Sequence, residues 1–336
     1  LETSATHRVP WIARTEIRTR LDRTVIVRHG TKEYRLPDFL IVGAARSGTS
    51  SLYFYLRSHP EIFMPEFKEP HFFNYLGKRS PHPGKPPWTL DDYAALFAPA
   101  ARGRLIGESS ASYLYFCEET IKNIRSVYGP RYRDLKIVGI LRNPIDKAWS
   151  YHMLLRRKGH TDDFFTMVDK HCRGDGPKEF HDFIHSGMYA AHVKAYREAF
   201  PFVKFVLFDQ LRDNPVSVLS EIFTFLRVKD TSYVPKDIGT AYNASGEATG
   251  GILTGVQDFL FHDNALKARL KGLMPYELRQ RIKTWVARKS LRRREMPAEI
   301  REYLAGIYKP EVERLLPLFP GKEKRSIMRS WLPHGE

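Results

Sequence analysis

Three apolar runs stand out along the chain, and each is followed by small or polar residues and then by a segment with helical character. The runs cover Phe39–Val42, Leu135–Leu141 and Val203–Phe208. Continuous apolar runs of this length are typical of strands that are buried on both faces. The helical segments that follow start near Leu52, at Pro144 and at Asn214. This alternation predicts an α/β fold with a central, mainly parallel sheet that carries helices on both faces.

The ends of the three predicted strands bear most directly on function. Their apolar runs stop at Gly43, Arg142 and Asp209. The carboxyl ends of parallel strands meet at one edge of a sheet, where ligands of such folds bind. We therefore expect the loops after these residues to form the site. Two weaker elements are predicted as well, a strand over Leu105–Gly107 and a helix over Glu118–Val127.

The loop after the first strand has the spacing of a phosphate-binding loop. Gly43 and Gly48 are separated by four residues, as in loops that bind nucleoside triphosphates. Those loops continue with a lysine that reaches the β- and γ-phosphates, but this chain has Thr49 there, and its cation lies inside the loop as Arg46. The sequence therefore predicts a P-loop-like domain that binds an anion other than a γ-phosphate. The alternative is a tight strand-to-helix turn without a ligand.

A second candidate segment follows the strand that ends at Leu141. Arg142 enters the loop layer directly, and Ser150 lies about two helical turns further along. A guanidinium and a hydroxyl so placed can bind one further phosphate. The alternative is an ion pair between Arg142 and Asp146, with Ser150 as an ordinary helix residue.

The third candidate segment is Phe67–Phe73, in which Glu69 stands between a lysine and a proline and close to His71. A carboxylate beside aromatic side chains can accept a proton from a substrate. The alternative is a loop whose aromatic side chains enter the core while Lys68 and Glu69 remain in solvent.

Composition narrows the class of protein. The chain has 336 residues, of which 42% are hydrophobic, enough for a sizeable core. It contains no run of about 18 apolar residues, so no membrane span is expected. Its two cysteines, Cys117 and Cys172, match neither a disulfide framework nor a zinc pattern, which favours a reduced, cytoplasmic protein without a metal. Because residue 1 is leucine, a removed N-terminal anchor remains the alternative.

The charge of the chain is strongly basic and unevenly spread. The formal net charge is +16, which favours anionic partners. Residues 267–294 contain eleven Lys or Arg and one acid. We divide the chain into an N-terminal extension, residues 1–36, with a short β-like run at Thr24–Val27, and one domain, residues 37–336, whose C-terminal part is helical and basic. The segment Arg281–Arg294 leaves open a protein that binds nucleic acid or a membrane surface.

Taken together, the three candidate segments resemble those of the sulfotransferases that use 3′-phosphoadenosine-5′-phosphosulfate (PAPS), above all the branch with glycosaminoglycan (heparan sulfate-type) and bacterial enzymes. Ala45–Ser51 is similar to the 5′-phosphosulfate loop of this family, Arg142–Ser150 to its 3′-phosphate motif, and Lys68–Phe73 to the segment that supplies the catalytic base. Further family segments are resembled by Gly107–Tyr115, Ser186–His192 and Phe200–Pro201. The similarity extends from about residue 37 to Trp331.

This resemblance implies an enzyme that moves a sulfuryl group from PAPS to a hydroxyl or an amine and releases 3′-phosphoadenosine-5′-phosphate (PAP), without a metal. Arg46 would neutralise charge on the leaving oxygen, and Arg142 and Ser150 would bind the 3′-phosphate. Glu69 would be the general base, with His71 as the second candidate. The N–H groups that would hold the 5′-phosphate belong to Ser47, Gly48, Thr49, Ser50 and Ser51.

The acceptor and the location are less closely specified. A glycan is expected, with a small molecule or a lipid as alternatives, and Lys68, Tyr113 and Tyr189 are the candidate acceptor-binding residues. Ser109 stands where the glycosaminoglycan enzymes usually have a lysine. An enzyme of that branch with a removed anchor would lie in the Golgi lumen. A nucleotide kinase is the alternative enzyme, and no nucleic-acid partner is expected; the residues do not specify an oligomeric state.

Overall fold

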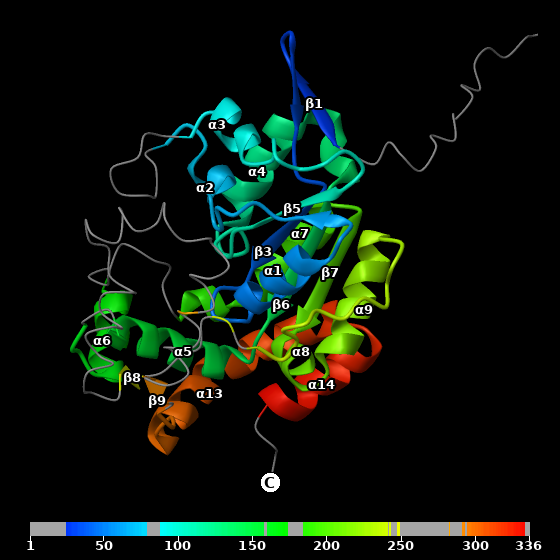
Figure 1. Cartoon of the computed structure of the whole chain (residues 1–336). Coiled ribbons are helices and arrows are strands. Elements are labelled where there is room, and N and C mark those ends of the chain that lie inside the picture. Colours follow the sequence, from blue (N-terminus) through cyan, green and yellow to red (C-terminus); the bar gives the residue numbers. More distant parts are fainter. Residues whose placement is uncertain are drawn as a thin grey trace, which may run out of the picture.

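The computed structural model describes residues 25–78, 88–157, 160–173, 184–240, 242, 247–248, 282, 291–292 and 294–332. Its centre is a five-stranded sheet in the order β4-β5-β3-β6-β7, in which all neighbouring strands are parallel (Figure 1). The strands are β3 (Phe39–Gly43), β4 (Ile62–Phe63), β5 (Leu105–Ser109), β6 (Lys136–Leu141) and β7 (Phe202–Leu207). The predicted α/β fold is confirmed, and the three most apolar runs, β3, β6 and β7, are neighbours in the sheet.

Helices and two short antiparallel pairs complete the described structure. The pairs are β1 (Ile26–His29) with β2 (Lys32–Arg35), and β8 (Glu247–Ala248) with β9 (Leu291–Arg292). The α-helices are α1 (Thr49–Ser58), α2 (Phe72–Tyr75), α3 (Leu90–Ala95), α4 (Cys117–Tyr128), α5 (Pro144–Arg157), α6 (Phe164–Cys172), α7 (Tyr189–Ala199), α8 (Phe208–Asp213), α9 (Pro215–Leu226), α13 (Ala298–Leu315) and α14 (Gly321–Trp331). The 3₁₀ turns are η1 (Gly129–Asp134), η2 (His185–Gly187) and η3 (Leu316–Leu318).

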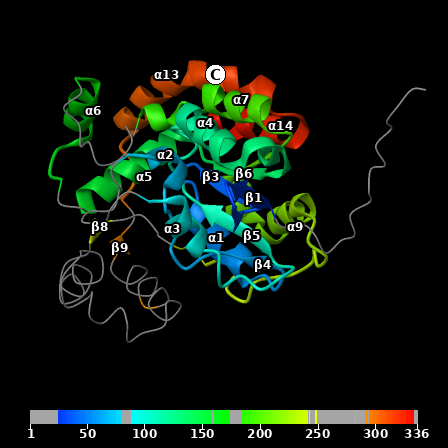
Figure 2. The same ribbon diagram turned by 90° about the horizontal axis from the view of Figure 1, so that it is seen from above.

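Each face of the sheet has its own hydrophobic core, because successive side chains of a strand point to opposite faces. Phe39 and Ile41 of β3 pack on one face with α1 and α9. Leu40 and Val42 belong to the core on the other face, together with α4, α7 and α14. Figures 1 and 2 show the sheet between these two helical layers. A third cluster joins α5, α6 and α13 beside the sheet.

The described part of the predicted N-terminal extension packs against the sheet. The carboxylate of Asp38, just before β3, accepts hydrogen bonds from the backbone N–H groups of Val25 (2.9 Å) and Ile106 (2.7 Å). Val25, Val27 and Leu36 are buried in the same core as β3. The hairpin of β1 and β2 is thereby attached to the domain, whereas residues 1–24 lie outside the described part. The boundary at residue 36 stays a prediction.

Several elements differ from those expected. Helices α2 and α7 were not predicted, although Tyr189, Val193 and Tyr196 have the i, i+4, i+7 spacing of a helix face and are buried. The predicted third strand included Phe208, but β7 ends at Leu207 and Phe208 begins α8. Most of the basic segment Arg281–Arg294 lies outside the described residues, so that prediction is not tested.

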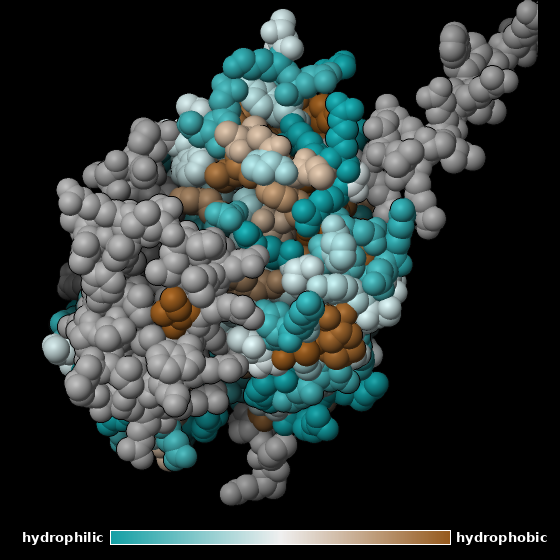
Figure 3. Space-filling model, in the orientation of Figure 1, coloured by the Kyte–Doolittle hydropathy of each residue, from teal (hydrophilic) through white to brown (hydrophobic). Residues whose placement is uncertain are grey.

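The exposed hydrophobic side chains of the described residues are dispersed over the surface. Figure 3 shows a largely hydrophilic face with separate hydrophobic patches among the described residues. The exposed large hydrophobic side chains come from elements far apart in the fold, among them Phe67, Phe116, Phe165 and Met328. Within the described residues, no helix combines the length and the apolar character that a membrane crossing requires.

Candidate active site

The loop between β3 and α1 is shaped by a glycine that no other residue can replace without strain. Gly48 has φ of 94°, and a Cβ atom at this position would lie 2.9 Å from Cδ2 of Phe208. Left-handed backbone and close contact both demand glycine here. Arg46 also has a positive φ, 64°. The chain therefore turns sharply after β3, and α1 begins at the carboxyl end of this central strand of the sheet.

The first turn of α1 has the properties of an anion site. Leu52 N–H donates to the Gly48 carbonyl (3.1 Å), so the N–H groups of Thr49, Ser50 and Ser51 come before the first intrahelical bond. The first turn contains no acidic residue. Free N–H groups and the helix dipole together favour an anion.

Side chains of this loop also have structural partners. The Ser51 hydroxyl donates to the Thr240 carbonyl (3.4 Å) and accepts from the Tyr242 N–H (3.2 Å). Ser47 is fully buried, and its hydroxyl donates to the Ala45 carbonyl (3.5 Å). For Ser51, the backbone N–H is therefore a better candidate for ligand binding than the hydroxyl, whereas the Ser47 N–H already donates to the Ala44 carbonyl (3.3 Å) and would share this bond with a ligand.

Three predicted residues from two distant segments come together at this edge. Arg46 Nε donates to Ser150 Oγ (3.2 Å), and Arg142 Nη1 donates to the Arg46 carbonyl (3.2 Å). The alternative partner for Arg142, Asp146, instead forms an ion pair with Arg301 of α13 (3.1 Å). Parallel pairing of β3 with β6 brings about this meeting, because both strands end on the same edge.

The electrostatics of the site are dominated by cations. Burial, and to a smaller extent the charges of nearby Arg157 and Arg142, lower the pKa of Arg46 to about 9. Tyr151 and Glu69 act in the opposite direction and raise this pKa. Positive charges that disfavour one another become favourable once a polyanion lies between them. The predicted base, Glu69, therefore lies within electrostatic range of Arg46 in the phosphate loop.

One buried cation of this region was missed by the sequence analysis. Lys147 of α5 is fully buried, and its Nζ donates to Ser186 Oγ (2.5 Å). Burial lowers its pKa to about 7, and the charges of Arg142 and Arg46 contribute. The available signal was its position, since it follows Arg142 by five residues at the start of a helix, but charged residues there are usually solvated.

The segment with Glu69 combines ion pairing with an unusual backbone. Lys68 Nζ lies 2.5 Å from Glu69 Oε1, and His71 Nε2 lies 3.8 Å from Glu69 Oε2. The Glu69 side chain is 35% exposed, so its carboxylate is accessible although it is paired. Glu69 and His71 have φ of 61° and 54°, values that cost energy in residues other than glycine.

Hydrogen bonds from the end of β5 hold this segment in place. Glu69 N–H donates to the Ser109 carbonyl (3.0 Å), and His71 N–H donates to Ser110 Oγ (3.0 Å). His71 Nδ1 lies 2.6 Å from Ser112 Oγ. The next two side chains, Phe72 and Phe73, enter the core as the alternative reading expected, but Glu69 does not simply remain in solvent.

Two predicted acceptor-binding tyrosines lie in the interior. Tyr113 is fully buried, and its hydroxyl accepts from the Phe73 N–H (3.4 Å). Tyr189 is also buried, and its hydroxyl donates to the Arg142 carbonyl (3.1 Å). Both hydroxyls form hydrogen bonds with main-chain groups near the site, and neither side chain faces solvent. Lys68, the third candidate, is the ion-pair partner of Glu69.

Glu108, the neighbour of Ser109, is a second carboxyl group near the base. It is fully buried, and its oxygens accept from Ser110 Oγ (2.6 Å) and from the Tyr93 hydroxyl (3.2 Å). Burial raises its pKa to about 7. In the described part of the chain, no group of three or more His, Cys, Asp or Glu side chains could hold a metal ion.

Comparisons with known proteins identify the family to which the chain belongs. The family model described as "Sulfotransferase domain" matches residues 36–238. Human bifunctional heparan sulfate N-deacetylase/N-sulfotransferase 3 is 30% identical over 213 residues, 58% of this chain and 22% of that protein. Mouse heparan sulfate glucosamine 3-O-sulfotransferase 3B1 is 27% identical over 203 residues, 60% of this chain and 48% of that protein.

A solved structure extends the likeness beyond the matched region. The crystal structure of a sulfotransferase from Alicyclobacillus acidocaldarius is 28% identical, with a TM-score of 0.59, and the match covers 86% of this chain and 98% of that one. The chain belongs to the sulfotransferase family, and so to the transferases. The resemblance stated from the three sequence segments is confirmed. The matched part amounts to about a fifth of the first curated relative and about half of the second.

Proposed function

We propose that this protein transfers a sulfuryl group from PAPS to a hydroxyl or an amine of an acceptor, and that residues 37–336 form the catalytic domain. The observation that carries the proposal is the meeting of Arg46, Arg142 and Ser150 at the start of α1. A nucleotide with phosphates at both its 5′ and 3′ positions needs two anion sites side by side, and this edge offers both. Membership of the sulfotransferase family supports the same donor.

The two anion sites have distinct roles in the proposal. The N–H groups from Ser47 to Ser51 bind the 5′-phosphate, because they lie at the helix start and carry its positive dipole end. Arg142 and Ser150 bind the 3′-phosphate, where the planar guanidinium can donate two parallel hydrogen bonds. A nucleotide without a 3′-phosphate would leave these groups without their ligand, so PAPS is preferred to ATP.

The transfer itself is an in-line displacement at sulfur. The acceptor oxygen or nitrogen forms a bond to sulfur while the bond between sulfur and the 5′-phosphate oxygen breaks. The electron pair of the broken bond stays on that phosphate oxygen, and PAP leaves. Arg46 stabilises the charge that develops there, as fixed cations do in phosphoryl transfer.

The proton of the acceptor goes to Glu69 as the acceptor attacks. Glu69 is accessible, paired with Lys68, and close enough to Arg46 to influence its pKa. His71 is the second candidate base, but its Nδ1 is already 2.6 Å from Ser112 Oγ. We therefore assign the base to Glu69 and a positioning role to His71.

For the acceptor, we propose a glycan. The two named relatives act on heparan sulfate or its glucosamine, according to their names. The net charge of +16 also suits an acidic polymer. A phenol or a lipid is the alternative acceptor.

Binding and transfer assays test the proposal separately. In calorimetric titrations, PAP should bind more tightly than ATP with Mg²⁺; tighter binding of ATP would favour a kinase instead. Labelled PAPS is then offered with unsulfated heparan-type polysaccharide, with its N-deacetylated form, and with phenol and lipid pools. Label in the first polymer indicates a hydroxyl acceptor, additional label in the second an amine. Label only in the pools would overturn the glycan, and label nowhere the transfer.

A further inference from the structure

We propose that Asn143 is a positioning residue for recognition of the donor's 3′-phosphate, and that it acts by joining the end of β6 to the last turn of helix α14. This inference rests on the proposed function, because it concerns how Arg142 is held toward that phosphate. It assigns part of the donor site to the C-terminal helix, which lies outside the residues that the family model matches.

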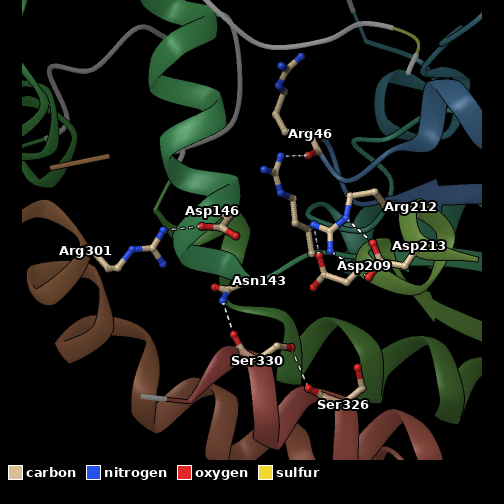
Figure 4. Close-up of polar contacts among 10 residues, drawn as sticks. Arg46, Asn143, Asp146, Asp209, Arg212, Asp213, Arg301, Ser326 and Ser330 are labelled. Carbon is tan, nitrogen blue, oxygen red and sulfur yellow. Dashed lines mark hydrogen bonds and ion pairs between the residues drawn. The ribbon is translucent and has the colours of Figure 1, made fainter. Parts of the chain in front are cut away.

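The side chain of Asn143 is fixed at both ends. Its Oδ1 accepts from the Ile145 N–H (3.0 Å), and its Nδ2 donates to the Ser330 carbonyl (3.0 Å) (Figure 4). The residue is 6% exposed, so the bond from Ile145 is buried and the bond to Ser330 is partly buried. The first bond satisfies a free N–H at the start of α5, the helix that carries Ser150. The second bond crosses to α14, so the bend between β6 and α5 is tied to a remote element.

The carbonyl group of Arg142 is held by Tyr189 of α7, and Tyr189 in turn packs against the same helix, α14. The Arg142 carbonyl accepts from the Tyr189 hydroxyl (3.1 Å). The ring of Tyr189 packs against Trp331, with 6.2 Å between the ring centroids. Ser330 and Trp331 are consecutive residues at the end of α14. One turn of this helix therefore restrains the backbone of Arg142 through Asn143 and through Tyr189.

The position of the Arg142 backbone determines where its guanidinium lies, because two contacts already fix the side chain relative to its neighbours. Its guanidinium donates to the Arg46 carbonyl and lies 4.8 Å from the centre of the Phe208 ring. A shift of its backbone would move the guanidinium away from Ser150, with which it must share one phosphate. A misplacement of about 1 Å at such a site can cost about 100-fold in rate. Asn143 touches no substrate in this proposal, and its effect passes through Arg142.

The test compares two nucleotides that differ only in the 3′-phosphate. Asn143→Ser keeps an oxygen for the Ile145 N–H but is too short to reach the Ser330 carbonyl. Loss of one buried hydrogen bond should weaken PAP binding about fivefold to tenfold, while binding of 5′-AMP stays unchanged. The control is Arg301→Gln, which removes the ion pair between Arg301 of α13 and Asp146 of α5. This variant should leave the ratio of the two affinities unchanged.

A double-mutant cycle separates positioning from general damage. Once Arg142→Gln has removed the group that is positioned, Asn143→Ser should weaken PAP binding no further. An unchanged ratio of affinities in Asn143→Ser, or an equal loss for both nucleotides, would overturn the inference. If that variant does not fold, Trp331→Leu should lower the same ratio about threefold by loosening Tyr189, and an unchanged ratio there would also overturn it. A wild-type protein that does not prefer PAP to 5′-AMP would instead contradict the proposed function.

Discussion

The donor side and the base side of the site are built in different ways. On the donor side, the groups that we propose to bind the 5′-phosphate are main-chain N–H groups at the start of α1, and the covalent continuity of β3 and α1 places them. On the base side, Glu69 and His71 adopt left-handed backbone conformations and depend on the end of β5, where Ser109, Ser110 and Ser112 are their partners. The proposed 5′-phosphate site is therefore local in sequence, whereas the base side is assembled across about 40 residues and the proposed 3′-phosphate pair, Arg142 and Ser150, lies about 100 residues from the loop.

This difference indicates which substitutions should impair turnover alone and which should also impair donor binding. A main-chain anion site tolerates many side-chain changes, since its donors are present in every residue but proline. The segment of the proposed base, in contrast, is held in part by the hydroxyls of Ser110 and Ser112, which contact His71, so it depends on individual side chains. We expect substitutions on the base side to alter turnover and leave donor affinity intact, and those on the donor side to alter both.

The largest effect is expected for Glu69→Gln, which removes the proposed base and keeps the size of the side chain. Turnover should fall about 10³-fold, within the range for loss of a general base. The dissociation constant for PAP, measured by calorimetry, should stay within about twofold because the donor side is untouched. Glu66→Gln is the matched control, since Glu66 pairs with Arg57 at the surface. Near-normal turnover in Glu69→Gln would move the base elsewhere.

On the donor side, Arg46→Met should lower turnover about 10²-fold and also weaken PAP binding. The reason is the loss of a fixed cation from the leaving oxygen. Arg46→Lys serves as the comparison variant: it keeps the charge but not the planar fork, and should recover part of the loss. Turnover and PAP affinity are measured together. A change in PAP affinity without any change in turnover would contradict a role at the leaving group.

The third prediction concerns the serines that hold the base segment. Ser112→Ala removes the partner of His71 Nδ1 and of the Asn74 amide (2.8 Å). Turnover should fall about tenfold, as expected when one or two buried hydrogen bonds are lost and the base segment loosens. PAP affinity should not change. Ser58→Ala, which removes a hydroxyl bond to the Tyr55 carbonyl at the far end of α1, is the control. Equal effects of the two substitutions on turnover would contradict the special role of Ser112.

The smallest effect on turnover is expected for Glu108→Gln. This substitution should instead change how the free energy of unfolding depends on pH. The folded pKa of Glu108, about 7, lies above its ordinary value of 4.5, so the folded protein binds more protons between these values. Stability should therefore fall as pH rises from about 5 to about 7, by up to about 3 kcal/mol for this group.

Thermal unfolding of wild type and Glu108→Gln across this pH range checks that expectation. The glutamine stays neutral, so the wild-type protein should lose stability relative to the variant as pH rises. A difference between the two proteins that is constant with pH would show that Glu108 does not titrate as expected. Comparison of the two curves removes the contributions of other groups, such as Asp38, whose pKa burial raises to about 6.

Features with local signals in the sequence were predicted, whereas contacts between distant segments were not. The strand runs, the loop from Gly43 to Thr49 and the start of α5 at Pro144 were predicted, because their signals lie within a few residues. The roles of individual site residues stay predictions. The partnership of Arg46 with Ser150 was not foreseen, since it depends on how far the ends of β3 and β6 are offset.

Contacts between distant segments had no local signal. The bond from Asn143 to the Ser330 carbonyl joins residues 187 positions apart, and nothing in either neighbourhood indicates the other. Tyr113 and Tyr189 were considered as acceptor-binding residues because aromatic side chains occur both in cores and in binding sites, and only the fold places them in the interior. The burial of Lys147 was missed for the same reason.

The position of β3 has a consequence for how the protein is made. It is the earliest of the five strands in the chain, yet it lies in the middle of the sheet, and its partner β6 starts about 100 residues later. At ordinary translation speeds, the nascent β3 waits about 5 to 20 s for this partner. Its other partner, β5, is made earlier, so until β6 emerges the edge of β3 that faces β6 is unpaired, a state that favours association with other chains. We therefore expect this edge to need protection during synthesis, as a consequence of the topology that places the phosphate loop at the centre of the sheet.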